Sequence, residues 1–250
     1  MEASRFQLGC LHCSTHTIAQ LVDEVRALLR DTSLRPRTIL CVNAHIYNLA
    51  CSDAALRQTL NEARIVAADG VSIIGAARLF GRRIPQRCNM TEAFRAFLQA
   101  DDIRHNEGVL LGLTEEEARL AAANIECMSA HCRIVRCVSG YLSDAEYERI
   151  LRSLPAVDFA FVGMGTPKTE RVARIAAGAC PQAIVWGIGG GTMKIFAGSM
   201  QEAPALMRRW GLQWLYRLYR EPSRLWRRYL IGNFLFICRI LVSALKRRRR

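Results

Sequence analysis

From residue 6 to about residue 186, short apolar or β-branched runs alternate with longer stretches whose apolar positions recur every three or four residues. The short runs are typical of buried strands and the longer stretches of amphipathic helices. Strands are predicted at residues 6–8, 38–43, 64–68, 109–113, 133–138, 158–163 and 183–187. Helices are predicted at residues 15–30, 46–60, 91–99, 115–129, 144–154 and 168–177. This alternation predicts an α/β fold with a parallel sheet and crossover helices.

Ser14, Thr114 and Ser143 each precede a helical pattern, and their hydroxyls suit the N-cap position. No linker rich in Pro, Gly or Ser divides the first 200 residues. We therefore expect one domain over residues 1–200, followed by a helical segment over residues 201–250 that we call the appendage.

The appendage begins with an amphipathic pattern at residues 207–220, which Glu221 and Pro222 interrupt. A second helical segment follows, and then the apolar residues 231–245. This stretch contains Arg239 and is shorter than the roughly 20 apolar residues that a spanning helix needs. We expect it to lie in a membrane interface rather than to cross the bilayer.

Residues 206–250 contain 13 of the 35 Lys and Arg residues and a single acidic residue, so they carry 12 of the 13 net positive charges. Basic residues mixed with Trp, Tyr and Leu favour an anionic membrane surface as partner. Nucleic acid is a weaker alternative, because no nucleic-acid motif occurs elsewhere, and a solvated or oligomer-burying helix pair is another. The predicted membrane-contacting residues are Trp210, Trp214, Arg217, Arg224, Trp226, Arg227 and Arg228.

The first ten residues lack a signal-peptide core, so we expect a cytoplasmic protein. Ten cysteines without a secretory signal fit a reducing compartment. Cys10 and Cys13 form a lone C-x-x-C without a second pair at zinc-site spacing. Buried or incidental thiols are the favoured interpretation, with a zinc or redox role as the alternative.

In open parallel sheets the ligand lies beyond the carboxyl ends of the strands. Four such places carry polar or glycine-rich sequences, and they begin at Asn43, Asp69, Gly163 and Gly187. Glycine turns allow backbone N–H groups to approach a ligand, and Pro167 at a helix start would direct the positive helix end towards an anion. Plain tight turns are the alternative, but phosphate is the natural occupant of such a site.

Neither glycine turn has the spacing of a dinucleotide-binding motif or of a P-loop. The chain also lacks the Asp-x-Asp pair that presents a divalent ion to a nucleotide diphosphate. We therefore expect no metal and no cofactor, with positive side chains in the place of an ion.

The motifs together resemble glycosyltransferase family 26, the WecG/TagA/CpsF family, over nearly the whole chain. The matching stretches are Val42-Asn43-Ala44-His45, Ala68-Asp69-Gly70-Val71, Ile84-Pro85-x-Arg87, Gly163-x-Gly165-x-Pro167-Lys168-x-Glu170, Gly189-Gly190-Gly191-Thr192, Trp214-Leu215-Tyr216-Arg217-Leu218 and Glu221-Pro222-x-Arg224. The resemblance implies a Rossmann-like domain with a membrane-associating appendage. It also implies a UDP-sugar donor, often of the N-acetylmannosamine type, and an undecaprenyl-diphosphate-linked glycan acceptor at the cytoplasmic face of the bacterial cell membrane.

The resemblance further implies an inverting transfer, which needs a base for the acceptor hydroxyl and positive groups for the departing diphosphate. Asp69 is the candidate base, although an Asp at this position also suits a helix cap. Arg87 is the candidate for the diphosphate, because a forked guanidinium matches phosphate oxygens. Cys41 completes the predicted catalytic set. The predicted substrate-binding residues are Asn43, His45, Gly70, Gly163, Gly165, Thr166, Pro167, Lys168, Thr169, Glu170, Gly189 and Gly190.

The chain departs from the family pattern at four positions. Cys41 stands where members often have Thr, Thr169 where they usually have Gln, Glu202 where they have Arg, and Gln213 where they have Glu. The first two fall near the expected pocket and bear on which sugar is used. Two alternatives stay open at this point: a catalytically silent, membrane-bound UDP-sugar sensor or scaffold, and a dinucleotide-dependent oxidoreductase, against which the missing ribose-binding acid argues.

Overall fold

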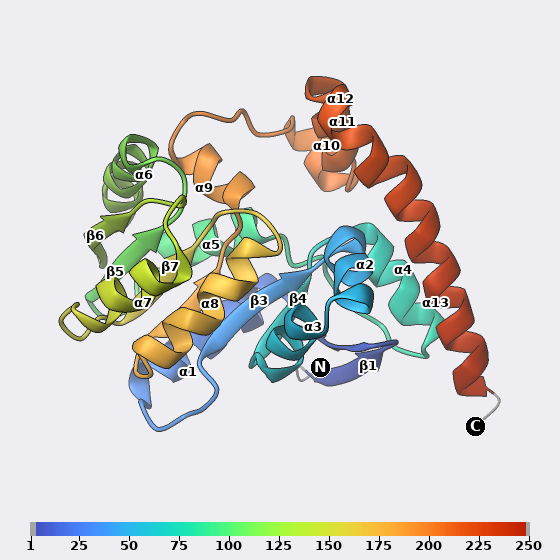
Figure 1. The fold of residues 1–250 in the computed structure, drawn as a ribbon, viewed down its shortest axis with the longest axis horizontal. Coiled ribbons are helices and arrows are strands. Elements are labelled where there is room, and N and C mark those ends of the chain that lie inside the picture. The colour runs from blue at the N-terminus through green and yellow to red at the C-terminus, as the bar shows by residue number, and fades with distance from the viewer. Residues whose placement is uncertain (1–3, 249–250) are drawn as a thin grey trace.

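The computed structural model describes residues 4–248 and forms one sheet of eight strands with helices on both faces (Figure 1). The strands are β1 (Arg5–Leu8), β2 (Leu11–Ser14), β3 (Thr38–Val42), β4 (Ile65–Ala68), β5 (Asn106–Leu111), β6 (Cys132–Val138), β7 (Phe159–Val162) and β8 (Ile184–Gly187). Their spatial order is β1-β2-β4-β3-β8-β7-β5-β6, and every pair is parallel except the β1–β2 hairpin. The predicted α/β fold with a Rossmann-like parallel sheet is confirmed.

The helices of the domain are α1 (Ile18–Arg30), α2 (Ala44–Ser52), α3 (Ala54–Glu62), α4 (Val71–Leu79), α5 (Met90–Leu98), α6 (Glu115–Met128), α7 (Asp144–Arg152), α8 (Lys168–Ala179) and α9 (Gly190–Phe196). Helices α2, α3, α4, α7 and α8 pack on one face of the sheet in one apolar cluster. Helices α1, α5, α6 and α9 pack on the other face, around Phe94, Phe161 and Trp186. The sheet is therefore covered on both sides, as its continuous apolar strands require.

Strands β3 and β8 are neighbours, but the helices that follow them lie on opposite faces of the sheet. The loops after the two strands therefore diverge and leave a crevice at their carboxyl ends. This arrangement is the topological switch point at which open α/β sheets bind ligands.

Several local features of the fold differ from the predictions. Ser14 does not cap a helix; it ends β2, and its hydroxyl accepts a hydrogen bond from the Val66 N–H at 3.2 Å. Helix α1 begins three residues later with a capping box of Thr17 and Gln20. The helix predicted at residues 46–60 is two helices, because Asp53 ends α2 and caps α3. Strand β2 and helices α4 and α9 were not predicted, whereas Thr114 and Ser143 are N-caps as expected.

The appendage forms α10 (Ala205–Arg209), α11 (Gln213–Arg220), α12 (Pro222–Trp226), the π-helical turn η1 (Arg227–Ile231) and α13 (Gly232–Arg248). In Figure 1, α10 to α12 lie above the carboxyl ends of the strands, and the long red helix α13 runs down beside α2 and α4. Arg249 and Arg250, which belong to the terminal basic run, lie outside the described residues.

One side of α13 is fixed to the domain. Phe236 and Ile240 are buried, and the Phe236 ring meets Tyr47 edge-on at 5.2 Å. Arg239 donates to the backbone carbonyl of Asn48 at 2.6 Å, and the Asn48 amide donates to the Gly232 carbonyl, also at 2.6 Å. The opposite side exposes Phe234, Ile237, Leu241, Val242 and Leu245.

The continuous helical stretch Pro222–Arg247 has 26 residues and is long and apolar enough to cross a membrane by length and composition alone. The helix is thus longer than the apolar residues 231–245 from which the interfacial placement was predicted, and that placement stays a prediction. How the helix meets a membrane depends on its packing against the domain, because that packing decides which of its faces are available.

Candidate active site

Two adjoining cavities open at the switch point. The larger, of about 450 Å³, is lined by the ends of β3, β7 and β8 and by appendage residues. The smaller, of about 150 Å³, lies between the end of β4 and the appendage. Six residues line both cavities: Asn43, Asp69, Asn89, Arg217, Arg228 and Tyr229. The site is therefore a two-part pocket with a shared wall that contains one carboxylate.

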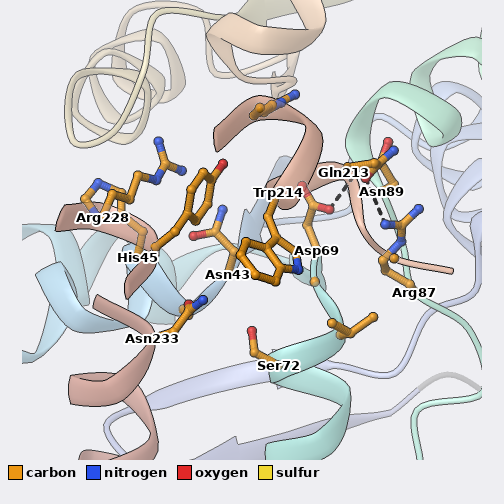
Figure 2. A pocket seen from close by; sticks show the side chains of 16 residues that line it. Asn43, His45, Asp69, Ser72, Arg87, Asn89, Gln213, Trp214, Arg228 and Asn233 are labelled. Carbon is orange, nitrogen blue, oxygen red and sulfur yellow. Dashed lines mark hydrogen bonds between the residues drawn. The ribbon is translucent and has the colours of Figure 1, made fainter. Parts of the chain in front are cut away.

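Asp69 directly follows β4, and its backbone N–H donates to the Val42 carbonyl at 2.9 Å. The N-cap of the next helix is Gly70, without a side-chain cap bond, so Asp69 does not cap that helix. Its carboxylate instead accepts a hydrogen bond from the Asn89 amide at 3.1 Å. Figure 2 shows this bond beside Gln213 and Arg87, with Trp214 in front.

Burial raises the pKa of Asp69 above its ordinary value, against the opposing effects of Arg87, Arg217 and the Asn89 hydrogen bond. Desolvation disfavours the charged carboxylate, and the neighbouring cations restore part of that loss. A carboxylate in this environment is a stronger base than one in water, which suits it to accept a proton from a hydroxyl.

Asn89 was not among the predicted site residues. Its side-chain oxygen caps α5 by accepting the N–H groups of Thr91 and Glu92, at 3.1 and 3.2 Å, which leaves its amide N–H groups for Asp69. The cap fixes the orientation of the amide and hence the direction of the bond to Asp69. Its place just before the predicted helix at 91–99 was the signal that could have revealed it.

Arg87 lines only the smaller cavity. Its guanidinium donates to the Gln213 side chain at 2.8 Å and to the Arg208 carbonyl at 3.2 Å, and it pairs with Glu92 at 3.4 Å. Gln213, one of the departures from the family pattern, thus supplies a neutral acceptor. Through these bonds Arg87 connects the Asp69 side of the pocket to the appendage.

Asn43 and His45 follow β3. The Asn43 side-chain oxygen caps α2 by accepting the Ile46 N–H at 3.1 Å, while the residue lines both cavities. His45 lines the smaller cavity, where burial and the positive charge of Arg228 lower its pKa to about 4. His45 is therefore a neutral imidazole at physiological pH.

The turn after β7 is held by a hydroxyl. Thr169 accepts the backbone N–H groups of Met164 and Gly165 at 3.1 and 2.9 Å. The Thr166 hydroxyl donates to the Glu170 carboxyl at 3.0 Å. Gly165 has φ +124° and Gly189, in the turn after β8, has φ +81°, so both turns use backbone conformations that favour glycine.

Most of the predicted donor-side residues line the larger cavity, namely Gly165, Thr166, Lys168, Thr169, Glu170, Gly189 and Gly190. Gly70 lines the smaller one. Gly163 and Pro167 belong to the turn after β7 but line neither of these two cavities, and Pro167 is the N-cap of α8. The Lys168 ammonium donates to the Leu142 carbonyl at 3.2 Å.

Two ionisable groups with raised pKa values line the larger cavity, Glu170 of α8 and the half-buried Cys41 of β3. Glu170 is 3% exposed, one of its oxygens lacks a hydrogen-bond partner, and burial raises its pKa. Cys41 also lines this cavity, and burial raises the pKa of its thiol well above the ordinary value. Cys41 is thus a neutral thiol in this structure, and its predicted catalytic role stays a prediction.

The appendage contributes more to the pocket than the sequence analysis expected. Arg217, Arg224 and Arg228, predicted to contact a membrane, line the larger cavity, and Trp214 lines the smaller one. A Cβ on Gly191 would lie 2.9 Å from an Arg217 guanidinium nitrogen, so this side chain rests directly on the glycine turn. Trp210, Trp226 and Arg227 are exposed, as membrane contact requires.

The described residues contain no group of three or more His, Cys, Asp or Glu side chains placed to hold a metal ion. The expectation of no metal and no cofactor stays a prediction.

Known proteins resemble this chain over most of its length. Three relatives from Staphylococcus aureus, of strains MW2, NCTC 8325 and MRSA252, are each named N-acetylglucosaminyldiphosphoundecaprenol N-acetyl-beta-D-mannosaminyltransferase. Each is 25% identical over 222 residues, which cover 88% of this chain and 86% of the relative. The family model for the glycosyl transferase WecG/TagA/CpsF family matches residues 7–250. This chain belongs to the WecG/TagA/CpsF glycosyltransferase family.

Proposed function

We propose that this protein is an inverting hexosyltransferase that moves a sugar from a UDP-sugar to an undecaprenyl-diphosphate-linked saccharide in the synthesis of a bacterial surface polysaccharide or exopolysaccharide. The observation that carries the proposal is the position of Asp69, on the wall shared by the two cavities and beneath arginines of the appendage. A base between a donor site and an acceptor site is what a direct displacement needs.

We assign the donor to the larger cavity. The glycine turn that leads from β8 into α9 and the Lys168 ammonium provide hydrogen-bond donors for a diphosphate, and the volume of this cavity suits a nucleotide sugar better than that of the smaller cavity. Arg217, Arg224 and Arg228 enter it from the appendage. The acceptor hydroxyl then reaches Asp69 through the smaller cavity.

The reaction follows from this placement. The acceptor hydroxyl attacks the anomeric carbon from the side of Asp69, which takes the hydroxyl proton, while the bond between that carbon and the diphosphate oxygen breaks. Negative charge develops on the departing diphosphate, and the guanidinium groups of Arg217 and Arg228 stabilise it. Arg87, the candidate for this task in the sequence, lines only the smaller cavity, where its bonds to Gln213 and the Arg208 carbonyl hold the appendage over the pocket.

The relatives' names support a hexose of the N-acetylmannosamine type and an N-acetylglucosamine-bearing lipid acceptor. The related uronic acid and glucose are the other donors that we consider. Thr169 bears on this choice, because its hydroxyl is engaged by two N–H groups of the turn and presents no amide to the sugar.

We further propose that the protein is peripheral on the inner face of the bacterial cell membrane. The first half of helix α13, from Gly232 to Arg239, is bound to α2 through hydrogen bonds with Asn48 and through the Phe236–Tyr47 ring contact. If α13 spanned the bilayer, α2 and its polar surface would have to enter hydrocarbon or release the helix. An α13 that lies flat presents its exposed apolar side to the lipid and keeps the pocket at the membrane surface.

The test is transfer by the purified full-length protein, with a panel of UDP-sugars and short lipid-diphosphate acceptors and mass spectrometry of the products. Asp69→Asn is expected to lower transfer by about 10²–10⁴-fold, the usual contribution of a positioned base, with donor affinity retained. Asp23→Asn is the matched control, because Asp23 is an exposed aspartate on α1. Full turnover by Asp69→Asn would remove Asp69 as the base.

A catalytically silent UDP-sugar sensor is the second candidate function. The engaged Thr169 hydroxyl and the neutral Cys41 thiol, both at family departures, favour it. The same assay separates the two, because a sensor binds a UDP-sugar but neither transfers nor hydrolyses it.

A further inference from the structure

Cys10 and Cys51 lie in contact outside the active site. Cys10 occupies the turn of the β1–β2 hairpin, and Cys51 lies in the last turn of α2. Their sulfur atoms are 3.5 Å apart, within hydrogen-bond distance for sulfur. Both residues are partly exposed, so a small solute has access to the pair.

The partner of Cys10 is thus not the residue that the C-x-x-C spacing indicated. Cys13 belongs to β2 and is fully buried in the apolar cluster, whereas Cys51 is 41 positions further along the chain than Cys10. The fold of α2 over the hairpin brings these two thiols together.

The surroundings of Cys51 favour its thiolate. The hydrogen bond from Cys10 is the largest of several effects that lower the pKa of Cys51 to about 6, and the charges of Arg239 and Arg57 and the Tyr47 hydroxyl act in the same direction. The pKa of Cys10 is raised by the same contact. The pair therefore shares one proton, which Cys10 holds, and Cys51 has the properties of the attacking group.

We propose that Cys10 and Cys51 form an oxidisable dithiol that a hydroperoxide converts into a disulfide. The Cys51 thiolate attacks a peroxide oxygen and becomes a sulfenic acid, and the O–O bond breaks to release an alkoxide or hydroxide, which takes up a proton. The Cys10 sulfur then attacks the Cys51 sulfur, the disulfide bond forms, and the sulfenic hydroxyl departs with the Cys10 proton as water. The two thiols lose two electrons, and the peroxide gains them.

The disulfide would tie the hairpin turn to α2 at the place where the appendage is fastened. Arg239 of α13 donates hydrogen bonds to the backbone carbonyl of Asn48 and to the Ser52 hydroxyl. Asn48 precedes Cys51 by three residues in α2, and Ser52 directly follows it. Oxidation removes the thiolate that faces Arg239, so this modification acts on the attachment of α13 to the domain.

The experiment treats the reduced full-length protein with one equivalent of hydrogen peroxide, blocks the remaining thiols with iodoacetamide, and maps the peptides by mass spectrometry. The expected result is a Cys10–Cys51 cross-linked peptide that disappears on reduction. The exposed Cys127 serves as the internal control for general oxidation. Oxidation of Cys127 without a Cys10–Cys51 link would overturn the proposal.

Two single variants assign the roles. Cys10→Ser is expected to accumulate a sulfenic acid at Cys51 that dimedone traps, whereas Cys51→Ser is expected to leave Cys10 in its reduced form. Trapping of Cys10 in Cys51→Ser at the rate seen for Cys51 in Cys10→Ser would contradict the assignment of Cys51 as the attacking thiol. Both readouts are covalent, so they do not depend on whether the protein transfers a sugar.

Discussion

At the residue scale, the central feature is a carboxylate held in an environment that disfavours its charge. Asn89 directs Asp69 by one hydrogen bond while using its own oxygen to cap α5. The arginines near Asp69 offset burial only in part, because the pKa of the carboxyl remains raised. A site built for stability alone would pair this charge more fully.

This imbalance predicts a pH-dependent stability difference. A raised pKa means that the folded protein binds the Asp69 proton more tightly than the unfolded chain, so the fold loses stability as the pH rises from the ordinary Asp pKa to the folded pKa, and the loss is complete above the folded pKa. Asp69→Asn lacks that charge, and we expect it to have a higher Tm than the parent protein at pH 8. The difference should shrink as the pH falls towards the ordinary Asp pKa of about 3.9.

Thermal unfolding of both proteins from pH 8 to pH 5 measures this effect. A lower Tm for Asp69→Asn than for the parent protein at pH 8 would mean that the arginines stabilise the charged carboxylate by more than its burial destabilises it. Asp23→Asn provides the baseline, since its carboxylate is exposed on α1.

At the element scale, α13 has two faces with different tasks. The inner face, with Phe236 and Ile240, packs on the domain, and the outer face, with Phe234 and Leu241, is exposed. The two phenylalanines are two positions apart and differ in exposure, at 3% and 69%. Substituting each phenylalanine in turn therefore distinguishes the packing of α13 on the domain from its contact with a membrane.

Phe236→Ala is expected to destabilise the docked helix by about 3–5 kcal/mol, the usual cost of such a truncation in a core. Limited proteolysis should then cut the appendage sooner than in the parent protein. Phe234→Ala should leave proteolysis unchanged and weaken binding to vesicles, because only an exposed ring can enter lipid. Equal proteolysis of the two variants would contradict the packing of α13.

At the scale of the whole molecule, the positive charge of the appendage is divided between the pocket and the surface. Arg217 and Arg228 line the cavities, whereas Lys246 lies at the far end of α13, beside a basic cavity that also includes Arg5 and Arg82. None of Arg5, Arg82 and Lys246 forms an ion pair within the described residues. Membrane attraction and catalysis should therefore respond to different substitutions.

Arg82→Glu combined with Lys246→Glu is expected to weaken binding to anionic vesicles by at least about tenfold, since each basic group near such a surface contributes roughly 1 kcal/mol. Transfer to a short, soluble acceptor should not change. Deletion of residues 206–250 should abolish both, because it also removes the pocket arginines. Vesicle co-sedimentation and the transfer assay measure the two effects.

The control for charge alone is Arg133→Glu combined with Arg136→Glu, which reverses two charges on β6 at the other edge of the sheet. The same loss of vesicle binding in this control would show that net charge, rather than the orientation set by α13, governs the attraction. Raised salt should weaken binding of the parent protein in either case.

The sequence alone determined the strand and helix alternation, and hence the parallel sheet and the edge at which its ligand site lies. Runs of apolar residues and their spacing are local signals, so β3, β4, β7 and β8 were placed to within a few residues. Asp69 and the glycine turns were found because strand ends are visible in the chain. Strand β2 was missed because its four residues include His12 and Ser14, so it lacks the continuous apolar run that marks the equally short β4, β7 and β8.

Only the tertiary structure decided which distant residues meet. Asn89 against Asp69, Arg217 on Gly191, and Cys10 beside Cys51 join segments that are far apart in the chain. Such contacts depend on strand order and on the return of the appendage over the sheet, and neither leaves a periodic trace in the sequence. For the same reason the sequence does not distinguish an arginine that contacts lipid from one that lines the pocket. That distinction depends on how the helix that carries the arginine packs against the domain.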